Sequence, residues 1–165
     1  MEKIVSNSSD PMISRLNRIG GVSALVLGMS YIIITTLYAL GGALTGGAEE
    51  WLTHLAGHTN EWWAILGFSV FTDFLFLPVA WSLYISLRGI NQNAILAGVS
   101  FLVLFVVLDL AVTWPNYASL IRLSSKYAAA ANDTQQMAVV AATYYPFEVL
   151  SSGLFGVYAI LVPSL

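Results

Sequence analysis

The chain has 165 residues, of which 58% are hydrophobic and 9% are charged, with a net charge of −3 and no cysteine. An ordinary soluble domain has roughly 25% charged residues, so this composition predicts a membrane protein surrounded by the lipid bilayer. The basic residues are few and scattered, which argues against nucleic-acid binding. The absence of cysteine excludes disulfides, thiolate nucleophiles and cysteine-ligated metals.

Four hydrophobic segments follow one another along the chain. Residues 22–40 are 19 uncharged residues, and residues 94–114 are 21 with a single acid. Both lengths match the ~20 residues of a membrane-spanning helix. Residues 62–87 and 137–162 have 26 each, enough to span with tilt. We therefore predict an all-α fold, a polytopic transmembrane four-helix bundle that forms one domain over residues 1–165.

The basic residues predict the orientation of this bundle. Lys3, Arg15 and Arg18 precede the first segment and Arg88 follows the second, whereas residues 41–61 contain no Lys or Arg. The positive-inside rule then places both termini of a multi-pass cell-membrane protein in the cytoplasm. In this topology four of the 6 basic residues lie inside and two lie outside. Tryptophans and tyrosines near the outer segment ends, among them Trp62, are expected to form an interfacial belt.

The stretch between the third and fourth segments predicts an extracytoplasmic helical hairpin. Residues 115–131 have a helical pattern, and Asn132 and Asp133, followed by Gln136, form a candidate helix N-cap with its capping-box partner. The fourth helix is therefore expected to begin near Thr134, clear of the membrane.

Three acids lie inside the hydrophobic segments: Asp73, Asp109 and Glu148. A charge at the bilayer centre costs at least ~2.5 to 3.5 kcal/mol, so intramembrane acids indicate a functional site by default. Asp73 and Glu148 each lie 11 residues from the outer end of their segment, Trp62 and Met137. We expect these two carboxyls to meet near the midplane and to share a proton.

This pair defines the predicted ligand or proton site. Its members are Asp73 and Glu148 with Tyr144, Tyr145 and Ser152 on the same helix face as Glu148. The structural alternative is that protonated acids hold the helices together through hydrogen bonds worth ~0.6 to 2 kcal/mol each.

Asp109 is expected to have a different role. It lies 5 residues before Trp114, about 7 to 8 Å below the outer interface at ~1.5 Å per residue. At that depth the long side chains of Arg122 or Lys126 are expected to reach it, which predicts an ion pair.

Two histidines and two acids form a weaker candidate metal site. Glu50, His54, His58 and Glu61 follow a helical spacing, and their side chains suit zinc or another divalent metal. An amphipathic helix lying at the membrane surface gives the same pattern without any metal. The sequence leaves any cofactor unknown.

Parts of the chain resemble a family of uncharacterised prokaryotic integral membrane proteins known only as a domain of unknown function. The resemblance rests on RLNRIGG at residues 15–21, SLYISLRGINQNAIL at residues 82–96 and SLIRLSSKYAAAANDTQQMAVVAA at residues 119–142. It implies a membrane fold with an external hairpin and gives no catalytic or binding residue. Members usually have about six spans, so this chain is expected to lack one pair of helices.

Three functions remain open at this stage. The first is a small non-catalytic membrane protein that acts as an accessory subunit of a larger membrane complex. The partners expected for the chain are the lipid bilayer and either other membrane subunits or further copies of itself. The second is a proton-linked carrier or small-molecule-binding protein that uses Asp73 and Glu148. The third is an intramembrane or metal-dependent enzyme. Because no catalytic motif occurs in the sequence, no catalytic residue is assigned.

Overall fold

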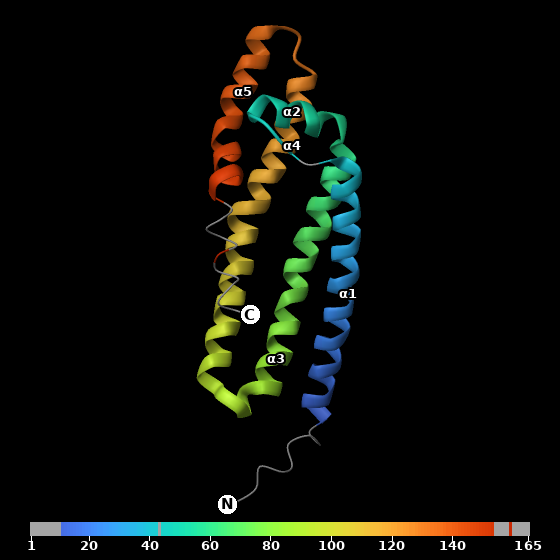
Figure 1. Ribbon diagram of the computed structural model, residues 1–165, viewed down its shortest axis with the longest axis vertical. Helices are drawn as coiled ribbons and strands as arrows, with labels where there is room; N and C mark the ends of the chain where they lie inside the picture. Colours follow the sequence, from blue (N-terminus) through green and yellow to red (C-terminus); the bar gives the residue numbers. More distant parts are fainter. Residues whose placement is uncertain (1–10, 43, 154–158, 160–165) are drawn as a thin grey trace, which may run out of the picture.

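The computed structural model describes residues 11–42, 44–153 and 159 (Figure 1), and in this part of the chain every regular element is helical. In chain order these are α1 (Pro11–Gly41), α2 (Ala48–Gly57), α3 (Thr59–Leu108), the π-helix η1 (Asp109–Thr113), α4 (Trp114–Ala128), α5 (Asp133–Glu148) and the π-helix η2 (Val149–Gly153). The prediction of an all-α fold is confirmed.

The helix labelled α3 consists of two antiparallel arms. Asn91 has a non-helical backbone (φ −151°, ψ 89°), and Figure 1 shows the chain reversing there at the end far from α2. The first arm contains the predicted segment 62–87. The second arm continues through η1 into α4, and the predicted segment 94–114 runs from this arm through η1 to the first residue of α4. The Asn91 side chain accepts a hydrogen bond from the Ala94 N–H at 3.2 Å, which starts the second arm.

Helices α4 and α5 form a helical hairpin, as the sequence predicts. Asn132 is the N-cap of α5, and its side chain accepts a hydrogen bond from the Gln135 N–H at 3.0 Å. The side-chain oxygen of Gln135 accepts a hydrogen bond at 3.0 Å from the N–H of Ala131, the residue before the N-cap. The predicted partner Gln136 instead donates its backbone N–H to the Asn132 carbonyl at 3.1 Å. The predicted fourth segment lies in α5 and η2 as far as residue 153, and most of its remainder falls outside the described residues.

Helix α2 lies across one end of the bundle against α4 and α5 (Figure 1). Its apolar residues Trp51, Leu52 and Leu55 are buried in the protein, so this amphipathic face is covered by other helices. Trp62 is also buried and stacks on Tyr117. Trp62 therefore belongs to the protein core and does not contribute to the interfacial belt that we expected.

The sides of the long helices carry many exposed apolar side chains. Leu25 and Ile32 of α1 are 73% and 69% exposed, and Phe74 of α3 is 55% exposed. Two helical runs, Pro11–Gly41 and Thr59–Ala128, are long and apolar enough to cross a membrane by length and composition. The second run includes the reversal at Asn91.

Helix α1 packs mainly against α3, and the two backbones approach closely at Gly20. A Cβ atom at Gly20 would lie 2.2 Å from the Cβ of Ser82, which is far closer than carbon atoms can pack. At Gly21 and Gly28 an added Cβ would meet nothing within 4 Å. Gly20 therefore faces α3, and the other two glycines face outward.

Candidate functional site

Two of the three acids that lie in the predicted hydrophobic segments are buried and close to each other. Asp73, on the first arm of α3, and Asp109, at the start of η1, are each 2% exposed. The indole Nε1–H of Trp114 donates a hydrogen bond to Asp73 Oδ2 at 2.6 Å. Asp109 lies near enough to act electrostatically on Asp73. Helix α1 contributes Tyr31, which lies near Thr72 and both acids.

Among the described residues, two oxygen atoms of this cluster make no hydrogen bond of good geometry, although the Thr113 hydroxyl lies close enough to Asp109 to act on its carboxyl. The two atoms are Oδ1 of Asp109 and Oγ1 of Thr113, and both are buried. Thr113 is fully buried, one turn beyond Asp109 on η1. By contrast, the hydroxyl of Thr72 donates to the Ser69 carbonyl at 2.7 Å. Unpartnered buried polar atoms are costly, so Asp109 and Thr113 are the residues of this cluster whose hydrogen-bonding capacity is least satisfied.

The π-helix η1 positions Asp109, Thr113 and Trp114 relative to α3. The backbone N–H of Trp114 donates a hydrogen bond to the backbone carbonyl of Asp109, five residues earlier. Pro115 follows directly and lacks the N–H that an α-helix needs at that position. Asn116 satisfies one nearby carbonyl by donating from Nδ2 to the Val112 oxygen at 2.7 Å. π-Helical turns of this kind occur frequently at functional sites.

The structure does not place Glu148 in this cluster. Glu148 is the last residue of α5 and its side chain is exposed, as are Tyr144 and Tyr145. The groups that act on Asp73 are Trp114 and Asp109. The side chain of Ser152 lies outside the described part of the structure. Asp73 is therefore brought together with Asp109 and not with its predicted partner.

The predicted ion pair of Asp109 with Arg122 or Lys126 is not formed. Both basic side chains are exposed on α4. They lie 13 and 17 residues farther along the same helical run, about 20 and 25 Å away at ~1.5 Å per residue. A side chain cannot cover that distance, and no ion pair with Asp109 occurs among the described residues.

The predicted metal ligands do not converge. Helix α2 ends at Gly57 and His58 has φ −129°, so the continuous helix that would align the four side chains is interrupted. Glu50 accepts a hydrogen bond from the Gly47 N–H at 2.5 Å as part of the α2 cap. The His54 and His58 ring centroids are 5.2 Å apart, and Glu61 belongs to α3. Residues 11–42 and 44–153 contain no group of three or more acidic or histidine side chains that could hold a metal.

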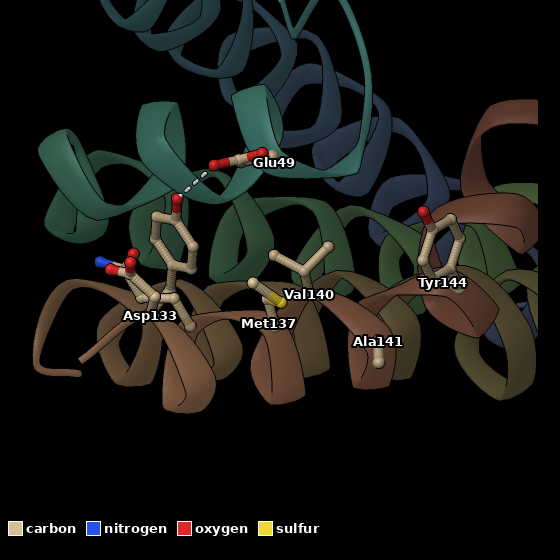
Figure 2. Close-up of a pocket in the computed structure, with 8 residues that line it drawn as sticks. Glu49, Asp133, Met137, Val140, Ala141 and Tyr144 are labelled. Atoms are coloured by element: carbon tan, nitrogen blue, oxygen red, sulfur yellow. Dashed lines mark hydrogen bonds between the residues drawn. The ribbon is translucent and has the colours of Figure 1, made fainter. Parts of the chain in front are cut away.

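A second polar region lies in an open groove between α2 and α5, with a volume of about 450 Å³ (Figure 2). On one side of the groove, the Tyr127 hydroxyl donates a hydrogen bond to Glu49 Oε1 at 2.7 Å, which links α4 to α2. This hydrogen bond raises the pKa of Tyr127 above its usual value of 10.0. The α5 side of the groove is lined by Asp133, Gln136, Met137, Val140, Ala141 and Tyr144.

No family model, curated protein or solved structure matches this chain. The family resemblance drawn from the sequence therefore stays a prediction, and the buried cluster has to be interpreted from its own geometry.

Sequence reasoning missed the association of Asp73 with Asp109 because it took Trp62 and Trp114 as markers of the outer membrane surface. Trp62 is buried under α2, and the helix that contains Trp114 continues to Ala128. Asp109 therefore lies deeper in the molecule than its spacing from Trp114 suggested. The Trp-Pro pair at 114–115 is the one local signal of the irregular turn.

Proposed function

We propose that this chain is a multi-pass membrane protein with four membrane-crossing segments: α1, the two arms of α3, and the fourth segment that begins in α5. The exposed apolar side chains along these helices support this placement. In water they would form a large apolar surface, which soluble monomers rarely expose, whereas in lipid they lie in their preferred solvent. We further propose that the α4–α5 hairpin is extracytoplasmic and both termini are cytoplasmic.

Within the membrane, we propose a non-catalytic role as a subunit of a larger complex. The observation that supports it best is the position of α1, which packs mainly against α3 at the edge of the described bundle. Its outward side presents Gly21, Ala24 and Gly28, all exposed. Small residues on one face let another transmembrane helix approach closely.

Native mass spectrometry of the protein extracted from its own membranes in a mild detergent tests this role. We expect a stoichiometric complex that contains another membrane protein, and we expect Gly28→Leu to release the chain from it. Gly67→Leu is the matched control, because Gly67 is an exposed glycine of α3 with open space around it. A free monomer in the wild type, or equal release by both variants, contradicts the proposal.

The second candidate function is a proton-linked carrier or small-molecule-binding protein. The buried Asp73–Asp109 cluster favours it, because intramembrane acids that face the protein interior mark ion and proton pathways. This function does not compete with the subunit role, since a subunit can contribute a binding site to its complex.

A further inference from the structure

The buried cluster formed by Asp73, Asp109, Thr113 and Trp114 has features that interhelical hydrogen bonding alone does not explain. If the acids served only to hold helices together, each buried polar atom would be expected to have a partner. Asp73 fits this expectation through its hydrogen bond with Trp114. Within the described part of the chain, Asp109 Oδ1 and Thr113 Oγ1 make no hydrogen bond of good geometry, although both residues are at least 98% buried and the Thr113 hydroxyl lies beside the Asp109 carboxyl.

The charges around the cluster indicate what kind of group is missing. The groups that act on the two carboxyls are Trp114, Thr113 and the carboxyls themselves, and none of these is a cation. The titratable side chains facing them from α1 are Tyr31 and Tyr38. The adjacent η2 has the sequence VLSSG, which contains no titratable residue. Two carboxylates in such a site would repel each other and be poorly solvated.

We propose that this cluster is a binding site for one monovalent cation, either a proton or an alkali-metal ion, with Asp109 and Thr113 as the principal ligands and Asp73 as the second carboxyl. A bound cation gives the unpartnered oxygens of Asp109 and Thr113 a partner and removes one negative charge from the membrane interior. Trp114 is a positioning residue, because its hydrogen bond fixes the carboxyl of Asp73. This inference deepens the second candidate function and rests on it.

Labelling with dicyclohexylcarbodiimide tests the site in the purified full-length protein. This apolar reagent modifies protonated carboxyls in apolar surroundings, and mass spectrometry locates the modified residue. If the cation is a proton, labelling at Asp73 and Asp109 falls about tenfold for each pH unit above the midpoint, as for a single titrating site. If it is an alkali-metal ion, replacing choline with Na⁺ at fixed pH and ionic strength suppresses the labelling.

A second measurement covers the case in which the reagent does not enter the site. A ligand that binds only the folded state raises Tm, so the wild-type Tm should depend on pH or on Na⁺. Asp109→Asn should lose the Na⁺ dependence, or the pH dependence that lies between the ordinary titration range of exposed acids and that of Tyr127. Asp133→Asn, the same substitution on the exposed end of α5, should retain it, and so should Glu148→Gln.

Labelling that is insensitive to both pH and Na⁺ overturns the proposal. An absence of labelling together with a Tm that changes with neither pH nor Na⁺ also overturns it. The same holds if the Tm response of the wild type persists in Asp109→Asn. Any of these results leaves the subunit role intact, because that role is judged by the mass of the native complex.

Discussion

At the scale of single residues, the contact between Trp114 and Asp73 has the clearest energetic consequence. It joins the first arm of α3 to α4, and its acceptor, Asp73, is only 2% exposed, whereas Trp114 is half-buried. The sequence places both residues in hydrophobic segments but gives no indication that they meet, because 41 positions separate them.

Trp114→Phe removes this indole donor and keeps an aromatic ring. We expect a loss of about 1 to 3 kcal/mol in the free energy of unfolding, because Asp73 Oδ2 is left buried without a partner. Unfolding by sodium dodecyl sulfate in mixed micelles, followed by circular dichroism, measures the change. Trp63→Phe is the control, since Trp63 is 37% exposed and should change stability by less than about 0.5 kcal/mol. Equal effects would show that Trp114 acts through its ring alone.

A second residue-scale prediction concerns Tyr127, whose pKa is raised by its hydrogen bond to Glu49. The bond stabilises the protonated phenol, so its contribution is present below the unfolded pKa near 10 and is lost as the pH rises through the higher folded value. Ultraviolet titration of the tyrosines should contain a late step that is absent in Tyr127→Phe. Glu49→Gln should move that step to lower pH, and an unmoved step would refute the assignment.

At the scale of elements, helix contacts depend on where small residues lie. Gly20, Gly21 and Gly28 look equivalent in the sequence, and only the structure shows that Gly20 faces Ser82 at a distance that excludes a side chain.

Gly20→Ala should destabilise the protein by about 1 to 3 kcal/mol, because the new methyl group forces α1 and α3 apart. Gly21→Ala, its neighbour in open space, should instead stabilise the protein by roughly 0.5 to 1 kcal/mol through helix propensity. Detergent unfolding of the two variants in parallel gives the comparison. If the two changes have the same sign, the packing of α1 on α3 differs from that described.

The hairpin between α4 and α5 depends on the Asn132 cap. Asn132→Ala removes the acceptor for the Gln135 N–H and should cost about 0.5 to 2 kcal/mol. Hydrogen exchange of the first turn of α5 should quicken, while exchange in α1 stays unchanged. Faster exchange throughout the molecule would mean that the hairpin and the bundle unfold together.

At the scale of the whole molecule, the proposed topology can be tested with single cysteines, because the chain has none of its own. Thr53→Cys and Ala129→Cys should react with a membrane-impermeant maleimide in intact cells, whereas Asn93→Cys should react only after permeabilisation. All three positions are exposed. The reverse pattern would place both termini outside the cell.

The sequence alone determined the helical character of the chain and the approximate positions of its turns, because both follow from local patterns of apolar residues, caps and turns. The helices themselves extend beyond the predicted segments, since α1 begins at Pro11 and the run that contains Trp114 continues to Ala128. The reversal at Asn91 and the Asn132 cap lie where the segment boundaries and capping signals placed them. The metal site predicted around His54 and His58 depended on an unbroken helix, which Gly57 and His58 interrupt.

Only the tertiary structure decided which acids meet. Depth along a helix was estimated from tryptophans assumed to lie at the membrane surface, and burial of Trp62 under α2 removes that reference point. The contact between Asp73 and Trp114, the proximity of Asp109 and the exposure of Glu148 result from how the helices are rotated and shifted against one another. Rotation and shift are set by long-range packing, which no local pattern in the chain specifies.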